Sequence, residues 1–103
     1  MNIIFFANGK FALNPLDELY KSNHKILAVV TNIDKKSGRK QLLHQTPIAT
    51  YSESNNLNLI KVNSLDEPDF INRIRNFSAD IFIVISYRIM PKILYSLPKF
   101  GSI

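Results

Sequence analysis

The sequence contains no cysteine and only two histidines. Without thiols, neither a disulfide framework nor a thiolate metal site can form, and two isolated histidines do not complete a metal site by themselves. We therefore expect no metal centre. The lack of cysteine also points to the cytosol, because proteins of reducing compartments do not depend on disulfides.

Long apolar runs are also missing. The strongest run, residues 81–85, is far shorter than the roughly 20 residues that a membrane-spanning helix needs. The opening stretch, residues 1–7, lacks the basic start of a secretory signal, and its apolar part is too short for one. The sequence has no internal repeats or low-complexity segments. We expect a soluble protein with no membrane partner, formed from one small domain or part of one.

Acidic residues are fewer than basic ones. Thirteen lysines and arginines face eight aspartates and glutamates, so the net charge is +5. An excess of this sign favours contact with a polyanion such as nucleic acid. Many small soluble proteins are basic without binding nucleic acid, so the charge alone leaves both interpretations open.

Several segments have the composition of β-strands. Three of them, Asn2–Ala7, Lys25–Thr31 and Asp80–Ser86, are almost continuously apolar, which is typical of parallel strands that are covered on both faces. Leu57–Val62 is a weaker candidate, and Gly101–Ile103 resembles the first step of a fifth strand.

Helical patterns lie between these strands. The clearest spans Glu67–Phe77, and Ser64 with Glu67 predicts a capping box at its start. Shorter helices are expected at Pro47–Glu53 and at Pro91–Ser96. The apolar residues of the clearest helix recur at helical spacing: Phe70, Ile71, Ile74 and Phe77.

An earlier helix is predicted by an apolar stripe that ends near Tyr20. Asn14 and Pro15 suit an N-cap followed by proline at the first helical position. Alternatively, the helix begins earlier, near Gly9, with Pro15 as a kink. The stripe consists of Ala12, Leu16, Leu19 and Tyr20.

The alternation of strands and helices predicts the fold class. It indicates an α/β protein with an open, parallel, Rossmann-like sheet flanked by helices, with strand order 3-2-1-4 and the start of strand 5. In such sheets ligands bind beyond the carboxyl ends of the strands, where the strand order reverses. This places candidate crevice walls at Asn8–Lys10 and at Ser86–Arg88, which follow strands 1 and 4.

Two polar segments are candidates for binding. The stretch from Asn32 to Gln41 shows neither helical nor strand period and is predicted to be a long loop. Its cations could neutralise successive phosphates, although a solvated surface loop is the alternative. Tyr87 and Arg88 follow a buried strand at the switch point, where either a site or ordinary loop packing is possible. The cations of the loop are Lys35, Lys36, Arg39 and Lys40.

The order of several short motifs resembles the N-terminal part of the methionyl-tRNA formyltransferases. The resemblance covers the whole chain, and it depends on the collinear order of the motifs because none is decisive alone. The motifs are Phe11-Ala12, Pro15-Leu16, Ala28–Thr31, Asp34, Gly38-Arg39, Thr46–Ile48, Asn63–Leu65, Ala79-Asp80, Tyr87–Lys92 and Leu97–Ile103.

This resemblance implies an enzyme with 10-formyltetrahydrofolate as cofactor and methionyl initiator tRNA as partner. The turn after strand 4 would line the pterin pocket, largely through backbone groups, with Tyr87, Arg88, Ile89 and Met90 as cofactor-binding residues. The basic loop would contact the acceptor end of the tRNA through Lys35, Lys36, Arg39 and Lys40, of which Arg39 matches the loop arginine of the family. A full-length enzyme of this kind is expected to be a monomer.

The resemblance also implies that residues 1–103 contain no catalytic residue. In the family, the amino group of the methionyl ester attacks the formyl carbon, an Asn and a His stabilise the oxyanion, and an Asp tunes the His. All three would follow Ile103, as would a C-terminal tRNA-binding domain. The chain is therefore expected to be an incomplete formyltransferase domain that is inactive alone.

Two departures from the family pattern bear on alternatives. Ala7–Lys10 stands where the family usually has Gly-Thr-Pro-Glu, and Tyr87 runs directly into Arg88 without the usual glycine. The open alternatives are a glycinamide ribonucleotide or nucleotide-sugar formyltransferase, and a non-catalytic α/β binding module. The first needs a glycine-rich phosphate loop after strand 1, which this sequence lacks.

Overall fold

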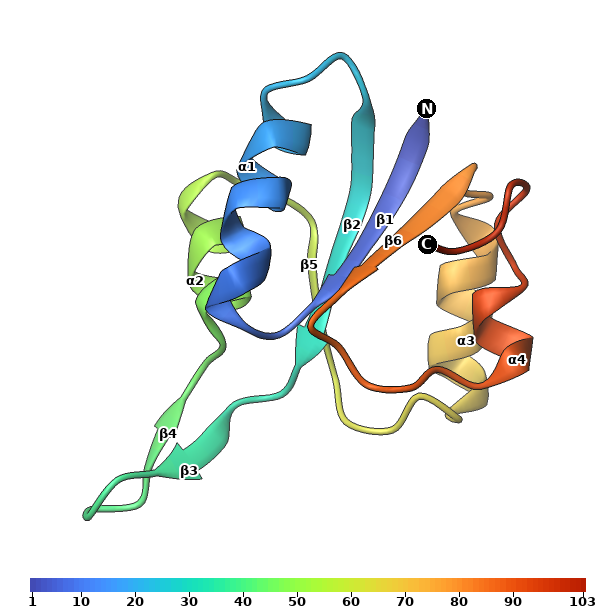
Figure 1. Cartoon of the computed structure of the whole chain (residues 1–103). Coiled ribbons are helices and arrows are strands. Elements are labelled where there is room, and N and C mark those ends of the chain that lie inside the picture. Colours follow the sequence, from blue (N-terminus) through green and yellow to red (C-terminus); the bar gives the residue numbers. More distant parts are fainter.

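The computed structural model describes residues 1–103 and contains a parallel sheet of four strands between helices (Figure 1). Its strands are β1 (Asn2–Ala7), β2 (Lys25–Asn32), β5 (Leu59–Val62) and β6 (Ile81–Ile85), in the order β5-β2-β1-β6. All three pairings are parallel. The predicted fold class and the predicted order 3-2-1-4 are therefore confirmed.

Strand β1 lies at the centre of the sheet, and its apolar residues are buried on both faces. Ile4 and Phe6 belong to the larger of two core clusters, whereas Phe5 and Ala7 belong to the smaller one. Successive side chains of a strand point to opposite faces, so the alternation assigns each cluster to one face. This two-sided burial is the reason for the continuous apolar run in the sequence.

Two helices cover each face of the sheet (Figure 1). On one face lie α1 (Leu13–Tyr20) and α2 (Pro47–Ser54), and on the other lie α3 (Pro68–Asn76) and α4 (Lys92–Tyr95). None of these helices has the length and apolarity required to cross a bilayer. The helical residues that enter the core are Leu16 and Ile48 on the first face, and Phe70, Ile71, Ile74 and Leu94 on the second.

The start of α3 differs from the prediction. The predicted capping box is wrong, because Glu67 is the N-cap and makes no side-chain capping bond, while the hydroxyl of Ser64 accepts a hydrogen bond from the Asp66 N–H at 3.4 Å. Pro68 occupies the first helical position, where its fixed φ angle suits the helix and its missing N–H is not needed.

The prediction that Asn14 caps α1 is also wrong, because the N-cap of this helix is Ala12. A 3-10 turn at Lys10–Ala12 follows Gly9 directly, with the Ala12 N–H bonded to the Gly9 carbonyl at 3.1 Å, and α1 continues from it. The alternative of an early start near Gly9 is correct. Pro15 lies in the first turn of α1, where backbone N–H groups have no intrahelical partner, so the proline does not interrupt the helix.

The predicted basic loop is a β-hairpin, so the expectation of an irregular loop is wrong. Strands β3 (Lys35–Ser37) and β4 (Leu42–His44) pair antiparallel and project from the body of the molecule (Figure 1). Gly38 and Gln41 have positive φ angles of 77° and 51° in the connecting turn. All six strand residues are exposed, and without a buried face the sequence carries no apolar alternation that would predict strands.

The last residues lie beside β6, as predicted for the start of a fifth strand. The Phe82 N–H donates to the Gly101 carbonyl at 3.2 Å, and the Ile103 N–H donates to the Phe82 carbonyl at 3.0 Å. Ser102 forms a parallel bridge with Phe82. The outer edge of β6 is thus partly paired.

The aromatic contacts of β1 generate a stability prediction. The ring of Phe6 lies 4.9 Å from that of Phe82 and 5.7 Å from that of Tyr87. Replacing Phe6 by alanine should lower the free energy of unfolding by about 3–5 kcal/mol, measured by urea denaturation, because it removes a fully buried ring. Phe11→Ala is the matched control, since Phe11 is 79% exposed, and should change this energy by less than about 0.5 kcal/mol. Equal losses in the two variants would contradict the core assignment.

Candidate functional site

The carboxyl ends of β1 and β6 touch at one edge of the sheet. The Asn8 N–H donates to the Ser86 carbonyl at 3.2 Å, so the two predicted crevice walls lie side by side. No cavity opens between them. Instead, one cavity lies between the segments that follow β5 and β6, and another lies at the base of the hairpin. The prediction of a crevice at this edge is correct, but its position between the two walls is wrong.

The first cavity, of about 500 Å³, is formed by the segments that follow β5 and β6, residues 63–66 and 88–91. Leu65 and Met90 are buried in its wall, whereas Ile89 is 98% exposed. Apolar side chains beside free backbone groups suit a flat ligand with polar edges. Of the four residues predicted to bind the cofactor, Arg88, Ile89 and Met90 line this cavity, whereas Tyr87 packs behind it against Phe6.

Arg88 connects the two segments that form this cavity. Its guanidinium donates hydrogen bonds to the backbone carbonyl of Asn63 and to that of Val62, the latter at 3.5 Å. Its Nε atom is buried without a hydrogen-bond partner. The Arg88 side chain therefore braces the cavity wall.

Tyr87 lies under the same guanidinium. The Arg88 Nη2 is 3.4 Å from the Tyr87 hydroxyl, and the cation lies 5.5 Å from the ring centroid. Burial raises the pKa of the Tyr87 phenol, while the bond from Arg88 and its charge oppose this rise. Tyr87 is therefore neutral at physiological pH.

The second cavity, of about 370 Å³, lies at the base of the hairpin. Ile33 is the one hydrophobic residue in its lining, and Lys35, Ser37 and His44 contribute to it from β3 and β4. The remaining lining residues follow β1 and β2 or precede α2: Asn8, Asn32, Ile33, Gln45 and Thr46.

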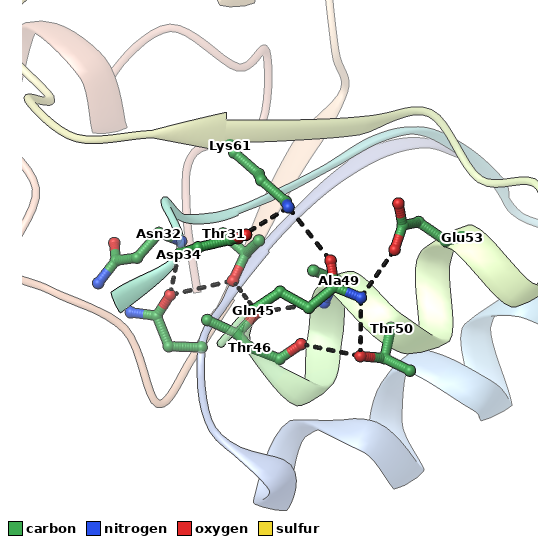
Figure 2. A network of polar contacts seen from close by, with 10 residues as sticks. Thr31, Asn32, Asp34, Gln45, Thr46, Ala49, Thr50, Glu53 and Lys61 are labelled. Atoms are coloured by element: carbon green, nitrogen blue, oxygen red, sulfur yellow. Dashed lines mark hydrogen bonds and ion pairs between the residues drawn. The ribbon is translucent and has the colours of Figure 1, made fainter. Parts of the chain in front are cut away.

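Thr31 is the buried centre of a polar network behind this cavity (Figure 2). Its hydroxyl donates to Asn8 Oδ1 at 3.1 Å and lies 2.6 Å from the hydroxyl of Thr46. Thr46 in turn caps α2, because its Oγ1 accepts from the Ala49 N–H at 3.1 Å. The network joins the ends of β1 and β2 to the start of α2. The sequence carries one sign of it, a threonine directly before Pro47, which is a typical helix start.

The four cations of the hairpin do not act as one group. Lys35 lines the second cavity, whereas the neighbouring Lys36 is on the opposite face of β3, and Arg39 and Lys40 lie in the turn. All four are exposed, and none takes part in an ion pair. The hairpin does not line the cavity at residues 88–91, so it extends from the same edge without covering that cavity.

Comparisons with known proteins identify the family of this chain. The formyl transferase family model matches residues 1–103. A methionyl-tRNA formyltransferase of Prochlorococcus marinus (strain MIT 9215) is 39% identical over 103 residues, which are 98% of this chain and 31% of that protein. That of Fusobacterium nucleatum is 35% identical over 104 residues, 100% of this chain and 33% of the relative. That of Flavobacterium johnsoniae is 30% identical over 102 residues, which are 99% of this chain and 32% of the relative. The chain thus spans about a third of the length of these relatives.

The contact between Arg88 and Tyr87 generates a prediction for pH. Replacing Arg88 by methionine removes a hydrogen-bonded cation that stabilises the phenolate, so the pKa of Tyr87 should rise further above its ordinary value. The measurement is a spectrophotometric titration of tyrosinate, with Tyr87→Phe variants identifying the signal. Arg75→Met is the matched control, because Arg75 bonds only to Asn72. A fall in the pKa of Tyr87 would contradict the contact.

Proposed function

The chain belongs to the formyl transferase family, and from this premise we propose that it binds 10-formyltetrahydrofolate and contacts methionyl initiator tRNA during formyl transfer between them. The observation that carries this proposal is the presence of two different sites at the carboxyl ends of the strands. A partly apolar cavity and the base of a cationic hairpin both lie there, and no residue lines both cavities. A folate donor and a polyanionic acceptor need two such sites.

The cavity at residues 63–66 and 88–91 is the proposed donor site. A pterin ring is flat, has an apolar face and carries hydrogen-bonding groups along its edge. Leu65, Ile89 and Met90 provide apolar contact, and the exposed backbone beside Ile89 can bond to the edge of the ring. Arg88 holds this wall in place through the carbonyls of Val62 and Asn63. Tyr87 supports the turn from behind, through its contact with Phe6.

The hairpin is the proposed contact for the acceptor. Its cations are solvent-exposed and free of carboxylate partners, so they can approach phosphates without first breaking an ion pair. The hairpin projects from the body, which lets it reach along an extended acceptor (Figure 1). The relatives compared above are named for action on methionyl-tRNA. The proposed tRNA contacts are Lys35, Lys36, Arg39 and Lys40.

The reaction itself makes one C–N bond and breaks another. The methionyl amino group attacks the formyl carbon, the bond to the folate nitrogen breaks, and the proton lost by the amine passes to that nitrogen. For residues 1–103 we propose binding and positioning, and we assign no proton transfer to them. The cavity at residues 63–66 and 88–91 binds the donor, and the hairpin positions the acceptor.

Salt dependence tests the acceptor contact. Replacing Lys35, Lys36, Arg39 and Lys40 together by glutamine should reduce the slope of log affinity against log salt by roughly three for initiator tRNA, because up to four counterions are no longer released. The matched control neutralises four exposed cations near the amino ends of the strands: Lys21, Lys25, Arg75 and Lys99. An identical slope for the two quadruple variants would show that the hairpin is not the contact.

Filling the first cavity tests the donor site. Ser64 lines the cavity, and Ser64→Phe should weaken the binding of tetrahydrofolate at least about tenfold, measured by isothermal titration calorimetry. Ser54→Phe places the same ring at the exposed end of α2 and should leave binding unchanged. Undiminished binding to the Ser64 variant would place the donor elsewhere.

A further inference from the structure

The direction of the hairpin is decided at its two ends. Strands β3 and β4 make their contacts mainly with each other, so little else supports them. Asp34 directly precedes β3, and Gln45 directly follows β4. These two residues, here called the legs of the hairpin, join it to the body of the molecule.

Lys61 is the one side chain that binds both legs (Figure 2). Its Nζ donates to Asp34 Oδ1 at 2.8 Å and to Gln45 Oε1 at 3.1 Å. Lys61 lies in β5, in register with Thr31 of β2, and is therefore carried by the sheet. A single ammonium group thus ties the start and the end of the hairpin to one edge strand.

The network continues from Gln45 into α2. The Gln45 Nε2 donates to Thr50 Oγ1 at 3.0 Å and to Glu53 Oε1 at 2.7 Å. On the other leg, the last backbone bond to the sheet runs from the Ile33 N–H to the Val62 carbonyl at 3.2 Å. After Ile33, the bond from Lys61 to Asp34 is what attaches the start of the hairpin to the sheet.

We propose that Lys61 is a positioning residue, which fixes the direction of the cationic hairpin and so presents its cations to the acceptor. This inference rests on the proposed function of the hairpin. The side chains of Lys61 and Asp34 are 31% and 34% exposed, and an isolated ion pair at such a site contributes little to folding stability. Its effect is on geometry, because the same ammonium group restrains two legs at once.

Removing the Lys61 ammonium group is expected to shift the population of hairpin directions. It does not remove any of the cations that contact the acceptor. Without the ammonium group, the hairpin samples several directions, and only a fraction of them suits the acceptor. The apparent affinity falls in proportion to that fraction, by about three- to tenfold. The salt slope should change little, because Lys35, Lys36, Arg39 and Lys40 are still present.

Distance measurements test the direction of the hairpin without any ligand. The chain has no cysteine, so spin labels can be attached at Leu43→Cys on the exposed face of β4 and at Glu18→Cys on α1. In this labelled chain, Lys61→Met should at least double the width of the distance distribution. Lys61→Arg should keep it narrow, because a guanidinium can reach the same two oxygens. Lys25→Met, an equal loss of charge at the far end of β2, should also keep it narrow.

Binding of initiator tRNA to the unlabelled variants completes the test. Lys61→Met should weaken binding by about three- to tenfold, while Lys61→Arg and Lys25→Met stay near the unsubstituted chain. All variants should unfold at the same midpoint temperature. This result would show that the loss of affinity comes from a misplaced hairpin and not from a loss of the fold. A narrow distribution in Lys61→Met, a broad one in Lys61→Arg, or broadening without loss of affinity would each overturn the inference. If the quadruple hairpin variant binds normally, the proposed function fails, and the distances still decide the role of Lys61.

Discussion

The two-sided burial of β1 is the constraint on which the rest of the structure depends. Its side chains enter both core clusters, so the sheet needs helices on each face and parallel neighbours on each side. Parallel pairing brings the carboxyl ends of all four strands to one edge. The segments that leave this edge form both cavities and the base of the hairpin, so the candidate sites follow from the burial of the central strand.

Two cavities border that edge, and the types of residue that line them differ. On one side, buried Leu65 and Met90 line a partly apolar cavity. On the other side, the lining residues apart from Ile33 are polar or charged, and they lie beside exposed cations. The proposed reaction brings together a heterocyclic donor and a polyanionic acceptor, which require unlike surfaces at close range. The two cavities at one edge are the reason for proposing that this chain contacts both reactants.

Cations have two distinct uses in this molecule, and the net charge of +5 does not distinguish them. Arg88 and Lys61 are bound to oxygens of other segments, and they act as braces for the first cavity and for the hairpin. The cations of the hairpin have no carboxylate partner and remain available to a ligand. An estimate of nucleic-acid binding from net charge alone would count the bracing cations and the hairpin cations equally. Only the hairpin cations are free to replace the counterions of a nucleic acid.

The sequence by itself determined the four strands of the parallel sheet, their order and the turn at residues 87–90, because burial on both faces of a parallel sheet leaves a continuous apolar run that a local pattern reveals. The caps of α1 and α3 were misread because the competing signals there, two prolines and several cap-forming side chains, lie within a few residues of one another. The hairpin was missed because its exposed strands need no apolar pattern. Only the tertiary structure decided which way Arg88 turns and what Lys61 binds. Their partners are 16 to 27 residues away along the chain, and no local pattern records a hydrogen bond between segments that meet only after the sheet has formed.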